Sequence, residues 1–204
     1  GSRVRIPLAP PRWKPSRKAG FSHSCHPVLL SSPRREPARP STVGAMDELQ
    51  FHEIDSPLGR IGLVVTSAGV AKVLFESDGI DAERERIGAE AVVPLAGHQL
   101  AEYFAGQRRE FTVPLDYRFA TGFRSDVLRE LARVPYGHTT TYKELAAKVG
   151  NPKAVRAVGG ACANNPLPLL VPCHRVLRAD GGLGGYRGGS ETKRFLLELE
   201  GADV

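Results

Sequence analysis

The pattern of apolar and polar positions changes character along the chain. Three short runs rich in β-branched and aromatic residues, at 50–54, 60–66 and 70–76, are separated by turn-forming segments that contain Pro57 and Gly69. Turns this short join neighbouring antiparallel strands. The pattern therefore predicts a three-stranded antiparallel meander.

Helical spacing of apolar residues follows from residue 80 to about residue 104, with Pro94 inside this stretch. Proline lacks a backbone N–H and disfavours a helical residue before it, so we expect two helices separated near Pro94. Residues 111–115 are expected to add another strand. Residues 46–119 contain no obvious chemical site, and we interpret them as an N-terminal α/β structural domain.

Residues 120–204 are predicted to form a mainly helical domain. An amphipathic stripe indicates a helix over 123–134, and a second, short helix is expected over 142–149. A Gly-Asn pair ends that helix, and Pro152 is expected to be the first residue of the next one, which runs to about residue 163. Two short helices across a tight turn are typical of a helix-turn-helix.

The second helix of this pair consists of very small side chains and one long cation, Arg156. Recognition helices of the major groove carry several polar side chains for base edges, and this helix carries almost none. A shallow minor-groove contact with Arg156 inserted toward the bases fits better. The alternative is a helix packed closely on its neighbour, with Arg156 solvated, and the pattern alone leaves both open.

The net charge of +6 is unevenly distributed over three segments. Residues 1–45 hold nine basic side chains against one acidic, residues 46–119 hold seven against 13, and residues 120–204 hold 12 against eight. If any folded part meets a phosphate backbone, the excess of positive charge favours the last segment.

Residues 1–45 contain half of the prolines and no sustained periodicity, so we predict a disordered Pro/Arg-rich extension. Met46 is the only methionine, and we interpret it as a native start of translation preceded by leader or tag sequence. The alternative is a basic arm that binds DNA nonspecifically.

Three cysteines at irregular spacing, Cys25, Cys162 and Cys173, argue against a disulfide framework. No apolar run approaches the roughly 20 residues that span a bilayer, and no secretory signal is evident. Cys162 is interpreted as a packed thiol. A zinc site at His23, Cys25 and His26 is not expected, because structural zinc needs several Cys or His ligands in defined spacing.

A cysteine stands between a proline and a histidine in Pro172-Cys173-His174. This motif follows an apolar stretch that we interpret as a buried strand. A thiolate is the reactive form of cysteine, and a nearby base or positive charge can generate it. A Cys-His pair by itself also fits an ordinary core cysteine. The glycines at 181–185 lack the Gly-Lys-Ser/Thr of a phosphate loop, and we interpret them as a flexible pocket wall.

The ordered series of motifs from residue 135 to residue 201 resembles the O6-alkylguanine-DNA alkyltransferase family. The matching pieces are Pro135-Tyr136-Gly137, Thr141-Tyr142, Gly150-Asn151-Pro152-Lys153-Ala154, Arg156-Ala157-Val158-Gly159, Asn165-Pro166, Pro172-Cys173-His174-Arg175-Val176, Gly185-Tyr186 and Leu196-Leu197-Glu198-Leu199-Glu200-Gly201. The resemblance covers residues 48–202, in outline only before residue 135. It implies an α+β fold with a small ribonuclease H-like N-terminal domain.

The resemblance implies that the damaged nucleotide is flipped out of duplex DNA, with Arg156 filling the stack and Tyr142 crowding the phosphate. Cys173 would attack the alkyl carbon, His174 would take the thiol proton through a water polarised by Glu200, and Tyr142 would help to protonate the leaving guanine. The resemblance also implies DNA contacts by Lys153, Ala154 and Gly159, and a substrate pocket with Asn165, Val176, Tyr186, Arg187 and Lys193.

A thioether is not readily hydrolysed, so the resemblance implies a protein consumed in one turnover, without metal or organic cofactor. Its partner would be double-stranded DNA containing O6-alkylguanine, bound by a monomer in the cytoplasm, or in the nucleus of a eukaryote. Activity on O4-alkylthymine and the preferred alkyl group stay open.

Two residues depart from the family pattern: Arg187 replaces a small residue, and Leu128 replaces a frequent Trp. Arg187 leaves the admitted size of the alkyl group open, whereas Leu128 is interpreted as a repacked core position. Two other functions compete with this one. A noncatalytic sensor of alkylated DNA is disfavoured because Cys173 is present, and a cysteine hydrolase leaves the helix pair unexplained.

Overall fold

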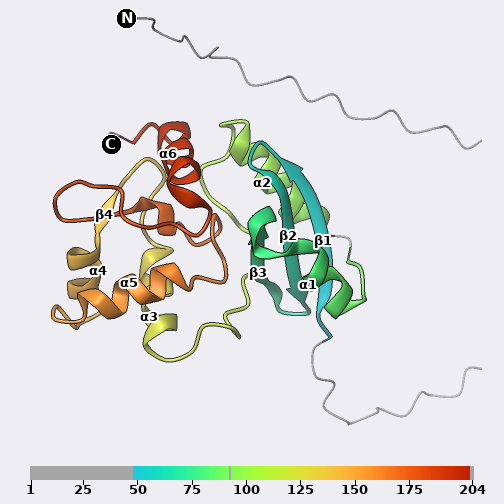
Figure 1. Ribbon diagram of the computed structural model, residues 1–204, viewed down its shortest axis with the longest axis horizontal. Helices are drawn as coiled ribbons and strands as arrows, with labels where there is room; N and C mark the ends of the chain where they lie inside the picture. Colours follow the sequence, from blue (N-terminus) through green and yellow to red (C-terminus); the bar gives the residue numbers. More distant parts are fainter. Residues whose placement is uncertain (1–47, 92, 203–204) are drawn as a thin grey trace, which may run out of the picture. The chain divides into compact units, whose positions relative to one another are not determined.

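A computed structural model describes residues 48–91 and 93–202, with strands and helices arranged as in Figure 1. The expectations for residues 1–45, for Met46 as a start of translation and for Cys25 lie outside the described residues. No helix in the described part of the chain is both long and apolar enough to cross a membrane.

The predicted meander is confirmed as an antiparallel sheet in the order β1-β2-β3. Its strands are β1 (Gln50–Ser56), β2 (Gly59–Thr66) and β3 (Gly69–Phe75). Five successive residues of β2, Ile61–Val65, include both faces of the strand, and four of them are apolar. All five are buried, so the central strand is covered on both sides.

The predicted break in the helical stretch is also confirmed, because α1 (Ile80–Ile87) and α2 (Pro94–Phe104) are separate helices. A short 3-10 helix, η1 (Glu76–Asp78), precedes α1. The helix α1 ends at Gly88 in the left-handed conformation, and the chain then pairs with β1 through two hydrogen bonds to Phe51.

The prediction of a strand over 111–115 is wrong. This segment makes an isolated bridge between Leu115 and Val70, where Val70 donates to the carbonyl of Pro114 (2.9 Å) and accepts from Asp116 (2.8 Å). Pro114 has no N–H to extend a ladder, so pairing with β3 stays confined to this point.

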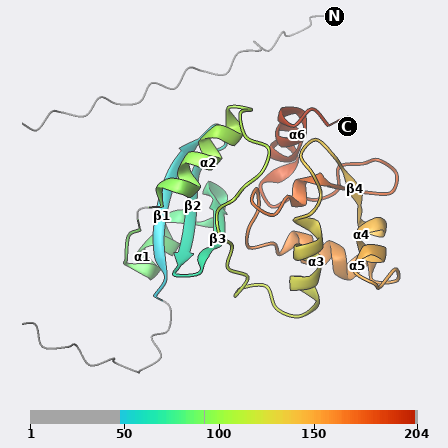
Figure 2. The same ribbon diagram turned by 180° about the vertical axis from the view of Figure 1, so that it is seen from behind.

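The second half is mainly helical, as predicted, with a two-stranded parallel pair, β4-β5. Figures 1 and 2 show α3, α4 and α5 close together, and α5 packs against both of the others. The elements are α3 (Phe123–Leu131), β4 (Thr140–Thr141), α4 (Tyr142–Lys148), α5 (Val155–Ala163), η2 (Cys173–Arg175), β5 (Val176–Leu177) and α6 (Gly189–Leu199).

The two helices of the predicted helix-turn-helix are α4 and α5. A capping box starts α4, since Glu144 N–H donates to the Thr141 hydroxyl (3.1 Å) and Thr141 N–H to the Glu144 carboxylate (2.8 Å). The expected start of the next helix at Pro152 is wrong. A turn, closed by Ala154 N–H on the carbonyl of Asn151 (2.9 Å), delays α5 until Val155.

The strand expected before Cys173 is also wrong, because residues 166–171 form turns. The side chain of Asn165 holds them: its amide donates to the Val171 carbonyl (2.8 Å) and accepts from Leu167 N–H (2.9 Å). Leu169 adopts a positive φ of 72°. These local bonds compete with a sheet ladder and bend the apolar run back on itself.

One hydrophobic core runs from the sheet through α2 and α3 to the segment before Cys173. The two halves also share a backbone hydrogen bond, from Val73 N–H on β3 to the carbonyl of Pro166 (2.7 Å). The loop that carries Cys173 is therefore supported directly by the N-terminal sheet.

Gly69→Ala is expected to destabilise the protein strongly. Gly69 has a φ of +139°, and a Cβ there would lie 2.2 Å from the carbonyl oxygen of Pro114. Gly79→Ala is the matched control, because Gly79 also has a positive φ (+79°) but nothing within 4 Å of an added Cβ. Chemical denaturation should show about 1 kcal/mol lost for the control and clearly more for Gly69→Ala. Equal losses would contradict the close approach of the 111–115 segment.

Candidate active site

The thiol of Cys173 lies at the start of η2 and is almost completely buried, with 4% of the residue exposed. The backbone N–H of Cys173 donates to the Val171 carbonyl (2.8 Å), and this bond closes the turn that Asn165 braces. Burial raises the pKa of Cys173, while the Asn165 side chain and the Lys193 ammonium act in the opposite direction. The resting thiol is therefore protonated and depends on a base for its reactivity.

A buried histidine follows the thiol in the chain and is oriented by a carboxylate. His174 and Glu200 are joined by a hydrogen bond of 2.9 Å between Nε2 and Oε1, with both side chains fully buried. Because an ionised carboxylate only accepts, we assign the proton of His174 to Nε2. The other ring nitrogen, Nδ1, is buried and has no partner in the described part of the chain, so it can accept a proton.

Burial lowers the pKa of His174, and the charges of Arg175 and Lys193 lower it further, against the opposing effect of Glu200. The imidazole is thus neutral at neutral pH and able to act as a base.

Glu200 accepts hydrogen bonds from four residues, and one of them, Arg175, is also its ion-pair partner. The guanidinium of Arg175 donates to Oε2 (2.8 Å) and to Oε1 (2.9 Å), and Gly137 N–H donates to Oε2 (3.2 Å). Burial disfavours the charged carboxylate, but hydrogen bonds from His174 and Arg175 hold the pKa of Glu200 well below its usual range. Glu200 is therefore ionised at neutral pH inside the protein.

The fourth donor is Tyr103, from α2, whose hydroxyl lies 2.7 Å from Oε1 of Glu200. The sequence indicated no chemical site in residues 46–119 and no role for Arg175. Arg175 stands in the cysteine motif and could have been suspected from it. Tyr103 is separated from Glu200 by 97 positions, and no local pattern links the two.

Lys193 lies fully buried on α6, and its ammonium donates to the carbonyls of Val176 (2.6 Å) and Leu183. These bonds connect the strand after the cysteine turn to the glycine-rich segment before Tyr186. Burial lowers the pKa of Lys193 to about 8. Lys193 thus holds the segment in place and brings near the thiol a positive charge, which acts to lower the pKa of Cys173.

Two tyrosines flank the same segment. Tyr142 is the first residue of α4. Its side chain lies close to the backbone of Gly184, because a Cβ added to Gly184 would lie 3.0 Å from the Tyr142 hydroxyl. Burial and the nearby thiols of Cys162 and Cys173 raise the pKa of Tyr142. The ring of Tyr186 contacts those of His174 and Phe75 edge-on, with centroids 6.3 and 5.9 Å apart.

Arg187 was expected to line the substrate pocket. In the structure its guanidinium pairs with Asp78 of η1 at 2.9 Å, and Asp78 also accepts from Phe75 N–H (2.9 Å). The long side chain is thus tied to the N-terminal half. Together with the contact between Phe75 and Tyr186, this pair joins the glycine-rich segment to the end of β3.

The residues expected to touch DNA lie on the helix-turn-helix. Arg156 and Lys153 are exposed, while Ala154 and Gly159 are partly exposed. The opposite face of α5 is buried through Val158, Ala161 and Cys162. The interpretation of Cys162 as a packed thiol is confirmed: it is 6% exposed, and burial raises its pKa to about 12.

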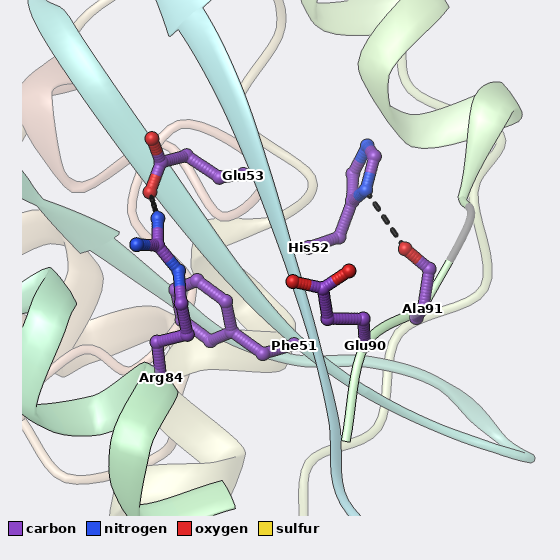
Figure 3. Close-up of a pocket in the computed structure, with 6 residues that line it drawn as sticks. All are labelled: Phe51, His52, Glu53, Arg84, Glu90 and Ala91. Carbon is purple, nitrogen blue, oxygen red and sulfur yellow. Dashed lines mark hydrogen bonds and ion pairs between the residues drawn. The ribbon is translucent and has the colours of Figure 1, made fainter. Parts of the chain in front are cut away.

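A separate polar depression beside β1 contains none of the expected site residues (Figure 3). Successive side chains of a strand point to opposite faces, and Figure 3 shows His52, bonded to the Ala91 carbonyl (3.0 Å), on one side of the strand. Glu53 is on the other side, paired with Arg84. His52 and Glu53 therefore do not face each other as they would around a bound ligand.

Comparison with known proteins places both halves of the chain in one family. Residues 50–117 match the family model of the 6-O-methylguanine DNA methyltransferase ribonuclease-like domain, and residues 122–202 match that of the DNA binding domain. The methylated-DNA–protein-cysteine methyltransferase of Methanosarcina acetivorans is 42% identical over 150 residues, which cover 72% of this chain and 96% of that protein. The chain belongs to the methylated-DNA–protein-cysteine methyltransferase family.

Other members of the family are similar over the same range. The methyltransferase of Mycobacterium tuberculosis is 40% identical over 157 residues, covering 74% of this chain and 92% of that protein. The crystal structure of Mycobacterium tuberculosis OGT in complex with DNA has a TM-score of 0.66 at 40% identity, covering 74% of this chain and 92% of that chain. The expected fold, a ribonuclease-like domain followed by a DNA-binding domain, is confirmed.

Glu200→Gln is expected to destabilise the protein, because it leaves the buried guanidinium of Arg175 without its charge partner. The expected loss is about 3–5 kcal/mol of unfolding free energy, measured by urea denaturation at pH 7. Since the folded protein lowers the pKa of Glu200, the wild type keeps this stabilisation above the usual carboxylate range and loses it as the pH falls further. The difference between the variant and the wild type should therefore shrink in acid.

The control is Glu130→Gln, which removes an ion pair with Arg133, a side chain that is 76% exposed. Its expected loss is within about 1 kcal/mol. A Glu200→Gln variant as stable as this control would show that the buried carboxylate is dispensable for folding.

Proposed function

We propose that this protein repairs alkylated DNA by direct reversal of the damage. It transfers a methyl or other alkyl group from O6-alkylguanine in duplex DNA to the sulfur of Cys173. The observation that carries the proposal is the buried series of Cys173, His174 and Glu200, in which a carboxylate orients an imidazole whose Nδ1 is free to accept a proton.

The thiol proton passes to Nδ1 of His174 through a water molecule, and Glu200 stabilises the imidazolium that forms. The thiolate then attacks the alkyl carbon in line with the bond to O6. A carbon–sulfur bond forms as the carbon–oxygen bond breaks, and the guanine leaves with the electron pair. Tyr142 donates a proton to the departing base and is reprotonated from the solvent, while His174 releases the thiol proton to the solvent, so that the protons balance overall.

The target base must leave the duplex, because a sulfur buried in the protein cannot reach a base edge inside the stack. The exposed side of α5 enters the minor groove, where its small residues allow a close backbone approach. Arg156, which has no ion-pair partner among the described residues, fills the space of the flipped base. Lys153, Ala154 and Gly159 contact the neighbouring backbone.

The flipped guanine enters beside Tyr142 and the glycine-rich segment. Backbone groups near Val176 and Tyr186 bind the edge of the base, Lys193 holds this wall, and Asn165 braces the nucleophile. The side chain of Arg187 pairs with Asp78 and does not bind the guanine, and only its backbone lines the pocket. Residues 46–119 are the structural domain in this proposal, and residues 120–204 carry DNA binding and transfer.

The product is a thioether, so each molecule reacts once. The protein acts as a monomer, and the reaction needs no metal or organic cofactor. A cytoplasmic location, or a nuclear one in a eukaryote, gives access to DNA. The alternative of a noncatalytic sensor of alkylated DNA is disfavoured by the presence of Cys173 together with an oriented base.

Incubation with a duplex that contains one O6-methylguanine should add one methyl group to Cys173. Intact-protein and peptide mass spectrometry should find 14 mass units, roughly one CH₂, on that residue at a one-to-one limit. Cys173→Ala should still bind the damaged duplex but gain no mass, and Cys162→Ala is the matched control that keeps transfer. Methylation at another residue would reject Cys173 as the acceptor, and binding without modification would favour the sensor.

Arg156→Ala should slow transfer from duplex DNA at least tenfold, or roughly 1.4 kcal/mol, while reaction with free O6-benzylguanine changes little. The reason is that the free base needs no flipping. The control is Arg86→Ala, which removes an exposed arginine of α1, distant from α5 in the chain. Rates come from single-turnover quench experiments. Equal slowing on both substrates would contradict the role of Arg156 in flipping.

A further inference from the structure

We infer that Tyr103, from the N-terminal half, is a positioning residue for alkyl transfer: its hydroxyl limits how strongly Glu200 binds the protonated form of His174. The inference rests on the proposed function, because it concerns the base of that reaction. It assigns a task in the chemistry to a part of the chain in which the sequence indicated only structure.

The contact itself is direct and buried. Tyr103 lies on α2 with no exposed surface, and its hydroxyl donates to Oε1 of Glu200 at 2.7 Å. The same oxygen accepts from Nε2 of His174 (2.9 Å) and from Nη2 of Arg175 (2.9 Å). Three donors therefore share the oxygen atom that faces the catalytic imidazole.

Neighbouring rings fix the position of this hydroxyl. The ring of Tyr103 packs against those of Phe111 (centroids 5.3 Å apart) and Tyr136 (6.1 Å), and it is next to Phe104 (5.5 Å). The hydroxyl also stays protonated, because burial and the charge of Glu200 raise the pKa of Tyr103 far above its usual value. Tyr103 is thus a constant donor at any pH at which the protein works.

A donor that shares a carboxylate oxygen withdraws negative charge from it, in competition with the imidazolium. Removal of the hydroxyl therefore leaves Glu200 a stronger partner for protonated His174, and the pKa of His174 rises. The other charged and titratable groups that face this pair, from each element packed against it, are Arg175 and Cys173 on η2, Lys193 on α6, Tyr186 before α6, and Tyr136 after α3.

Tyr103→Phe keeps the packed ring, and Glu200 keeps its bonds to His174 and Arg175, so no buried charge loses its last partner. Tyr136→Phe is the matched control. Its hydroxyl donates to the backbone carbonyl of Leu199 (2.9 Å), one residue before Glu200, and its ring contacts that of Tyr103. Both variants lose one tyrosine hydroxyl at the same helix end, but only one of them loses a bond to the carboxylate.

The experiment measures the rate of reaction with free O6-benzylguanine as a function of pH in the wild type and the two variants. The free base avoids the pH dependence of DNA binding. Transfer requires neutral His174, so the rate falls on the acid side with the pKa of that residue. In Tyr103→Phe this fall should move to higher pH by about half a unit to one unit, and in Tyr136→Phe it should stay within about 0.2 units.

An NMR titration of the His174 ring in the same variants measures the shift without depending on the rate. A pKa of His174 raised only in Tyr103→Phe supports the inference. Superimposable titrations of both variants overturn it, even if both are less stable than the wild type. A wild type that leaves Cys173 unmodified would instead reject the proposed function, and mass spectrometry distinguishes that result from the former.

Discussion

The buried carboxylate of Glu200 is the group around which the site and its links to both halves are organised. A carboxylate without solvent is costly unless charge and hydrogen bonds compensate it. Here Arg175 supplies the opposite charge with two bonds, and Gly137, His174 and Tyr103 supply the other donors. These donors come from the cysteine motif, a turn and an N-terminal helix, so satisfying one carboxylate brings together segments that are distant in the chain.

In the proposed mechanism, this arrangement explains how a buried cysteine can stay protonated at rest and still react. Burial raises the pKa of Cys173, which protects the sulfur as a thiol until a substrate is present. Burial also lowers the pKa of His174, which keeps the base neutral. The same exclusion of water therefore keeps both groups neutral at rest, and in the proposed mechanism the charge of Glu200 offsets the cost of forming the imidazolium.

The N-terminal half contributes more than a scaffold. It bonds to the loop before Cys173 through Val73 and Pro166, and it holds the glycine-rich segment through Asp78 and Arg187. A glycine-rich wall has little rigidity of its own, since glycine restricts the backbone least. Contacts from β3 and η1 provide the rigidity that the composition of the segment lacks.

The amino-acid sequence was enough to predict the meander, the break near Pro94, the helix pair and the motif around Cys173, because these follow from local periodicity, turn residues and family resemblance. It did not determine the start of α5 at Val155 or the turns at 166–171, where a backbone turn and the Asn165 side chain outweigh local propensity. Only the tertiary structure placed Tyr103 on Glu200 and Arg187 on Asp78. Each of these contacts joins residues about a hundred positions apart, and hydrogen-bond partners at that separation are decided by how the two halves pack, which no local pattern records.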